Sequence, residues 1–121
     1  MLLMDIGCHF RTPINISDDI ANHAGKRDLV VDLFSGSGNL YKAFLRKGNV
    51  DKAIAFDINS SLLANNSHNH KVICREVNCL DPTIIKKRIE KYNNKNLVFV
   101  LNPPFKRINK KNEQKYWEAF N

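Results

Sequence analysis

Residues 30–39 constrain the fold of this 121-residue chain more than any other stretch. They run Val-Val-Asp-Leu-Phe-Ser-Gly-Ser-Gly-Asn, an apolar run that holds one acid and ends in two glycines with one residue between them. A short apolar run that ends at glycine predicts a buried parallel strand. Glycine permits the positive φ angles and close backbone approach of a ligand-binding turn. We therefore expect a strand, a glycine turn and a helix that begins near Asn39 with its free N–H groups facing the turn.

Strands and helices are expected to alternate along the rest of the chain. The expected strands are residues 29–34, 52–57, 71–77 and 97–101. The expected helices are residues 12–24, 40–47, 59–66 and 83–92. This alternation predicts an α/β fold with a doubly wound, Rossmann-like parallel sheet, right-handed crossovers and strand order 3-2-1-4. Residues 1–11 are expected to be irregular. No further strand is expected after residues 97–101, which would leave that strand as an uncovered edge of the sheet.

The helices are predicted to be amphipathic, with defined ends. Their inward-facing residues are expected to be Ile16, Ile20 and Ala24, then Leu40, Phe44 and Leu45, and finally Ile84, Ile85 and Ile89. Thr12 can cap the first helix, with Pro13 in its first turn. Gly48 is expected to end the second helix. Asp81 is expected to cap the last helix, with Pro82 at its first position.

Polar side chains follow the expected strands where each strand ends. Asp57 closes the second strand about 20 residues beyond the glycine turn, where nucleotide-binding βαβ units place a carboxylate on ribose hydroxyls. A helix cap is the alternative role for this acid. Asn78 follows the third strand and Asn102 the fourth. Ligands of open α/β sheets bind outside the carboxyl ends of the strands, so these residues and the glycine turn should meet on one rim.

Two motifs together resemble a known family. Residues 32–38 (Asp-Leu-Phe-Ser-Gly-Ser-Gly) and residues 102–105 (Asn-Pro-Pro-Phe) resemble the class I S-adenosylmethionine-dependent methyltransferases, and among them the enzymes that methylate adenine amino groups in nucleic acid. Alone, the first motif also fits an ordinary strand-turn-helix, and Asn-Pro is common in rigid turns. The resemblance covers residues 12–105. Complete domains of that family have seven strands, so we expect a partial domain: a fragment, one part of a split enzyme or a cofactor-binding module.

The second motif implies the catalytic residues. By resemblance, the Asn102 side-chain oxygen and the Pro103 carbonyl accept the two amino hydrogens of adenine and aim its lone pair at the sulfonium methyl. Pro103 and Pro104 fix successive φ angles and so hold the direction of that carbonyl. Phe105 offers a stacking face for the target base, which must leave the duplex to reach the methyl donor.

The resemblance also implies S-adenosylmethionine as the cofactor. The residues that it assigns to this cofactor are Thr12, Pro13, Asp32, Gly36, Gly38, Asp57, Ile58 and Asn78. Helix 12–24 would close the methionine end of the cofactor site. Alternatively, it is an ordinary capped helix that packs on the sheet edge and has no role in binding. Ile58 would pack against the adenine ring. Asn78 stands where the family often has an acid, and its amide oxygen offers an uncharged acceptor for the same hydrogen bond.

Charge is unevenly spread along the chain. Residues 1–85 hold nine basic and nine acidic residues, whereas residues 86–121 hold ten basic and three acidic residues and so carry the whole net charge of +7. A basic third, with its tail at residues 106–121, suits DNA as the partner. The alternative explanation of this charge is the Lys- and Asn-rich composition that low-GC genomes produce.

The expected function is an N6-adenine DNA methyltransferase of restriction–modification type. Alternatives are an RNA adenine or protein-glutamine methyltransferase, or a non-catalytic module that needs a second chain to complete the sheet.

Cysteine and histidine usage predicts neither disulfides nor a metal site. Cys8, Cys74 and Cys79 are odd in number and irregularly spaced, so Cys74 and Cys79 are expected to be small core residues. The four histidines form no metal-ligand pattern with them. No apolar run resembles a signal peptide or a membrane span, so the cytoplasm is the expected location.

Overall fold

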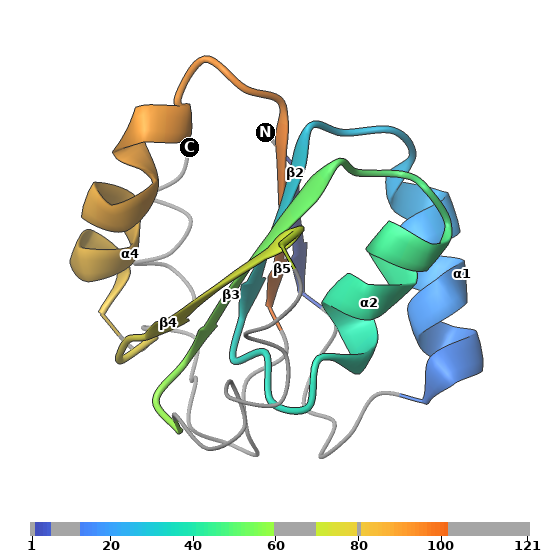
Figure 1. Cartoon of the computed structure of the whole chain (residues 1–121), viewed down its shortest axis with the longest axis horizontal. Coiled ribbons are helices and arrows are strands. Elements are labelled where there is room, and N and C mark those ends of the chain that lie inside the picture. Colours follow the sequence, from blue (N-terminus) through green and yellow to red (C-terminus); the bar gives the residue numbers. More distant parts are fainter. Residues whose placement is uncertain (1, 6–12, 60–69, 80, 102–121) are drawn as a thin grey trace.

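A computed structural model of the chain describes residues 2–5, 13–59, 70–79 and 81–101. Within these residues, five parallel strands form one sheet with helices on both faces (Figure 1). The strands are β1 (Leu2–Asp5), β2 (Leu29–Leu33), β3 (Lys52–Asp57), β4 (Val72–Glu76) and β5 (Leu97–Leu101). The helices are α1 (Ile14–Ala24), α2 (Asn39–Arg46), α4 (Pro82–Ile89) and the short 3-10 helix η1 (Glu90–Tyr92). Residues 60–69, which include most of the expected helix 59–66, lie outside the described residues.

The strand order is β1-β5-β2-β3-β4. The predicted 3-2-1-4 order of the four later strands is therefore confirmed. The prediction of an irregular segment is wrong for residues 2–5, which form β1, while residues 1 and 6–11 lie outside the described residues. The prediction that strand 97–101 is uncovered is also wrong, because β1 pairs with β5 from Leu2 opposite Val98 to Asp5 opposite Leu101. Four residues are too few for periodicity to identify a strand, and among the described strands β1 pairs with β5 alone.

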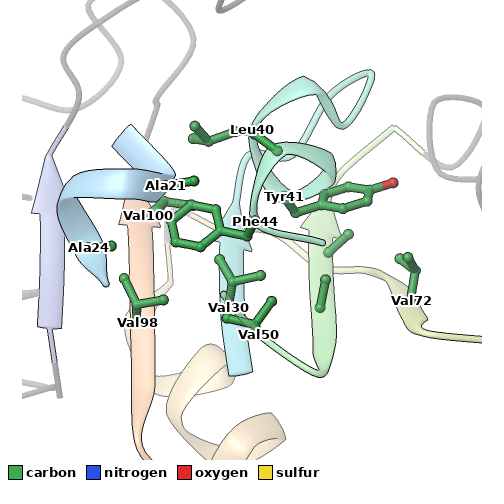
Figure 2. Packing of buried hydrophobic residues seen from close by; sticks show 13 residues of the cluster. Ala21, Ala24, Val30, Leu40, Tyr41, Phe44, Val50, Val72, Val98 and Val100 are labelled. Carbon is green, nitrogen blue, oxygen red and sulfur yellow. The ribbon is translucent and has the colours of Figure 1, made fainter. Parts of the chain in front are cut away.

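Two apolar layers hold the sheet between its helices. Successive strand residues point to opposite faces, so Val30 and Val98 belong to the layer under α1 and α2 while Val31 and Phe99 belong to the layer under α4. Figure 2 shows Phe44 of α2 among the residues of the first layer. Every residue of β2 and β5 is buried, as expected for strands that are covered on both faces.

The inward-facing residues predicted for α2 are confirmed, because Leu40 and Phe44 are buried and Leu45 packs against the same layer, whereas α1 and α4 differ in part from the prediction. The buried residues of α1 are Ser17, Ala21 and Ala24, whereas Ile20 is half-buried and Ile16 is 38% exposed. These small residues form the buried side of α1, while Ile20 packs at the edge of the layer and Ile16 faces outward. In α4, Ile85 and Ile89 are buried as predicted, but Ile84 is 40% exposed because it lies about 100° further round the helix.

The predicted helix ends are largely confirmed. Gly48 ends α2 with a φ of 69°, where its N–H donates to the Leu45 carbonyl and the Asn49 N–H donates to the Phe44 carbonyl, both over 3.1 Å. This pair of hydrogen bonds is the Schellman arrangement that glycine favours. At the start of α4, the Asp81 carboxylate accepts from the Thr83 N–H over 3.0 Å. Pro13 occupies the cap position of α1, and Thr12 lies outside the described residues.

Candidate functional site

The carboxyl ends of all the strands meet at one rim because the sheet is wholly parallel. Leu33 at the end of β2 lies opposite Phe56 and Leu101, and Asp57 at the end of β3 lies opposite Glu76. The glycine turn therefore begins at the same level as Asp57 and the end of β5. The predicted catalytic residues Asn102, Pro103, Pro104 and Phe105 follow β5 in the sequence but lie outside the described residues.

The turn after β2 is held in an unusual backbone conformation. Phe34, Gly36 and Gly38 all have positive φ, at 62°, 54° and 87°. The Ser35 N–H donates to the Phe56 carbonyl and the Gly38 N–H donates to the Ser35 carbonyl, both over 2.9 Å. A positive φ at a non-glycine residue such as Phe34 costs about 1–3 kcal/mol and persists only where the surroundings enforce it, often at a ligand site. The sequence pattern identified the glycines but gave no indication of this conformation at Phe34.

Asp57 joins the end of β3 to the glycine turn. One carboxylate oxygen, Oδ2, accepts from the Gly36 N–H over 2.8 Å, and the other, Oδ1, accepts from the Asn59 N–H over 2.9 Å. The second bond is the local cap-like contact that the alternative role predicted. The first bond places the carboxylate inside the predicted cofactor turn. Each carboxylate oxygen keeps a further lone pair, so both remain able to accept a ribose hydroxyl.

Asp32 lies beneath the same turn rather than on its surface. The residue is 1% exposed, and its Oδ2 accepts from the N–H of Tyr41, in the first turn of α2, over 3.2 Å. Its Oδ1 has no hydrogen-bond partner among the described residues. Burial raises the pKa of the Asp32 carboxyl to about 8, the Tyr41 N–H opposes that rise, and the charge of Asp57 adds to it. Asp32 therefore retains its proton at neutral pH and supports the start of α2.

Cys79 supports the turn from the β4 side. Its thiol lies 3.6 Å from the Val77 carbonyl, to which it donates. Burial raises the pKa of this thiol to about 12, while a hydrogen bond with the Phe34 backbone opposes the rise. Cys79 therefore stays protonated as a small packing residue, which confirms the sequence prediction. Its contact with Phe34 helps to explain how the strained turn is held. Cys74 is half-buried and packs against the layer under α2.

Two further predicted cofactor residues border the rim. Ile58 follows Asp57 and is 61% exposed, and a large apolar side chain in that position suits the face of a flat ring. Asn78 is exposed, and its backbone carbonyl accepts from the Asp81 N–H over 3.1 Å. The Val77 N–H donates to the Asp57 carbonyl over 3.0 Å, which holds the start of this loop beside Asp57.

Replacing Gly38 with alanine should lower the free energy of unfolding by about 1–3 kcal/mol more than the same change at Gly48. Both glycines have positive φ, so both substitutions carry the backbone cost. An added Cβ at Gly38 would lie 2.6 Å from the Tyr41 ring, whereas at Gly48 it would meet nothing within 4 Å. Urea unfolding of the two variants measures the difference. Equal losses would show that Tyr41 does not restrict this turn.

The described residues hold no group of three or more His, Cys, Asp or Glu side chains placed to bind a metal ion. Within the same ranges, no helix has the length and apolar character to cross a membrane.

Comparison with known proteins establishes the fold. The chain matches no protein-family model and no curated protein sequence. Among solved structures, it is similar to an rRNA methylase from Streptococcus thermophilus, with a TM-score of 0.53 and 16% identity over 94% of this chain and 67% of that chain. The described sheet with its flanking helices is therefore a Rossmann-like methyltransferase fold, as the sequence predicted.

Proposed function

We propose that this chain binds S-adenosylmethionine at the rim and transfers its methyl group to the adenine amino group of DNA. The observation that carries the proposal is the hydrogen bond from the Gly36 N–H to Asp57, which joins a carboxylate at the end of one strand to a positive-φ turn at the end of the next. This arrangement suits a nucleoside whose ribose lies on the carboxylate while the rest of the molecule crosses the turn. The methyltransferase fold supports methyl transfer as the class of reaction.

The residues of the rim fit this cofactor. A Cβ at Gly36 would meet no atom of the described residues within 4 Å, so none of these residues fills the space beside the turn. Asp57 would accept the ribose hydroxyls, and Ile58 would cover the adenine ring. Asn78 offers its amide oxygen to the adenine amino group. Thr12 and Pro13 are proposed to close the methionine end, with Asp32 and Gly38 shaping the turn beneath it.

The proposed chemistry belongs to residues 102–105, which follow β5. When bound, S-adenosylmethionine supplies a methyl group on a positively charged sulfonium. Asn102 and the Pro103 carbonyl would accept the amino hydrogens of adenine and so localise a lone pair that is otherwise delocalised into the ring. Pro104 would fix the direction of that carbonyl, and Phe105 would stack on the base at a gain of about 1–3 kcal/mol.

RNA is the second candidate substrate, because the similar solved structure is named as an rRNA methylase. Isotope-labelled S-adenosylmethionine offered with DNA, RNA and protein acceptors tests the two candidates together. We expect label in DNA as N6-methyladenine. Label in RNA alone would replace DNA by RNA in the proposal. Label in protein alone would overturn the nucleic-acid assignment.

Replacing Asp57 with alanine should weaken S-adenosylmethionine binding by roughly 10- to 100-fold, since a hydrogen bond to a charged group contributes about 1.5–3 kcal/mol. Isothermal titration calorimetry measures the loss. Asp51→Ala is the matched control, because Asp51 is an exposed acid just before the amino end of the same strand, and we expect it to bind as the unchanged chain does. Wild-type affinity in Asp57→Ala would remove the ribose role.

A further inference from the structure

The excess positive charge of the described residues comes from cations on α4, on η1 and in the turn that follows them. These residues are Lys86, Lys87, Arg88, Lys91 and Lys95, and all five are exposed. With Glu90 as the one acid among residues 86–95, this segment has a net charge of +4. Residues 13–59 contain six basic and six acidic residues and are neutral. We call residues 86–95 the basic face.

The packing of α4 explains why these cations face outward. Ile85 and Ile89 lie one turn apart and are buried against the sheet, so Lys87 lies on the opposite side of the helix. Within the part of the chain that the structure describes, no residue of the basic face forms an ion pair. The Lys91 ammonium lies 5.1 Å from the centroid of the Tyr92 ring, which leaves its charge exposed. The positive charge of this surface is therefore not neutralised by described residues.

The basic face begins near the rim and leads away from it. Asp81 caps α4 just after the loop that follows β4, and the helix then runs back toward the amino ends of the strands (Figure 1). At about 1.5 Å per helical residue, Lys86 lies roughly 6 Å beyond the start of α4, and the later cations lie further along. Figure 1 shows α4 on the opposite side of the sheet from α1 and α2. The basic face thus begins about one helical turn from the rim end of α4 and does not include the candidate site.

We propose that the basic face binds the phosphate backbone of the nucleic acid whose base is methylated at the rim. The inference rests on the proposed function and adds the surface that positions the substrate. Lysines act as point charges for phosphates and fix the position of a nucleic acid without reading its sequence. Insertion into a lipid surface would require a broad apolar face turned outward, whereas Ile84 is the one exposed isoleucine of α4 and Ile85 and Ile89 are buried against the sheet.

The test compares two variants that lose the same charge on different surfaces. The first replaces Lys86, Lys87 and Lys95 with glutamine, which leaves the Lys91–Tyr92 contact in place. The control replaces Lys26, Lys47 and Lys52 with glutamine, three exposed lysines outside the basic face. Fluorescence anisotropy measures the binding of a short DNA duplex and of an RNA duplex with the same sequence, without S-adenosylmethionine, between about 50 and 200 mM salt.

We expect the basic-face variant to bind both duplexes at least tenfold more weakly at low salt. The magnitude of the slope of log K against log salt should fall by about 2–3, because each lost phosphate contact lowers that magnitude by about 0.9. The control variant should retain both the affinity and the slope. The DNA and RNA arms show which nucleic acid the surface prefers. Thermal melting confirms that both variants remain folded.

Three results would overturn the inference: equal weakening in both variants, unchanged binding in the basic-face variant, or tighter binding of the wild-type chain to anionic phospholipid vesicles than to either duplex. Methyl transfer is measured separately. If the chain binds DNA through the basic face but transfers no methyl group, the inference about this surface is supported and the proposed function is contradicted. If both variants methylate DNA equally well and the salt dependence of binding is unchanged, the proposed function is supported and the inference about the basic face is contradicted.

Discussion

Replacing Asp32 with asparagine should remove most of the pH dependence of stability that we expect between about pH 4 and pH 8. Burial in the folded chain raises the pKa of the Asp32 carboxyl to about 8, from an ordinary value of 3.8. Between these two values the folded state keeps the proton and the unfolded state releases it. The free energy of unfolding should therefore fall as pH rises through this window, by up to about 1.4 kcal/mol per pH unit.

Asparagine suits this test because its side-chain oxygen can still accept from the Tyr41 N–H but carries no charge to desolvate. Urea unfolding of both chains near pH 5 and pH 8 measures the effect. The wild-type chain should lose several kcal/mol over that interval through this group alone, whereas Asp32→Asn should be nearly flat. Asp19→Asn, at an exposed position on α1, is the control and should follow the wild-type curve. Parallel curves for Asp32→Asn and the wild-type chain would contradict the assignment.

Much of the sheet could be predicted from the sequence, because each later strand is a continuous or nearly continuous apolar run between polar turns. The alternation of these runs with helices indicated the order β4-β3-β2-β5, which the structure confirms. The strand β1 could not be predicted, since residues 2–5 form a backbone ladder with β5, nearly a hundred positions later in the sequence. The inward face of α1 was predicted only in part: Ala24 is buried and Ile20 packs against the core, but Ile16 is exposed, and the burial of Ser17 and Ala21 was not predicted because it depends on the neighbouring elements.

In the candidate site, too, the features set by local sequence could be predicted, and the features set by tertiary contacts could not. Glycine spacing and the acid at the end of β3 placed Gly36 and Asp57 on one rim, and the structure joins them by a hydrogen bond. Cys79 was predicted as a core residue, but its position beside Phe34 and the positive φ of Phe34 were not, because both arise where the loop after β4 meets the turn after β2. The position of Asp32 beneath the turn likewise depends on α2, whose Tyr41 N–H it accepts.

Replacing Asn102 with alanine should reduce methyl transfer by at least two to three orders of magnitude while leaving S-adenosylmethionine binding intact. Asn102 follows Leu101, the last residue of β5, which lies opposite Leu33 at the level where the glycine turn begins. Asn102 is proposed to contact only the reacting amino group. Removing its side chain should therefore raise the barrier for methyl transfer and leave cofactor binding unchanged. Removing one preorganised hydrogen-bonding group from a reacting centre typically costs about 10²–10³ in kcat.

The control for this change is Asn94→Ala, because Asn94 is an exposed asparagine in the turn just before the opposite end of β5. Single-turnover methylation of DNA and calorimetric titration of S-adenosylmethionine, applied to both variants, separate the two steps. Loss of transfer with normal binding in Asn102→Ala alone would assign the chemistry to the residues after β5. Loss of binding as well would give Asn102 a part in holding the cofactor. Full transfer in Asn102→Ala would show that the amino group is oriented by other residues, and the adenine assignment would then lose the motif on which it rests.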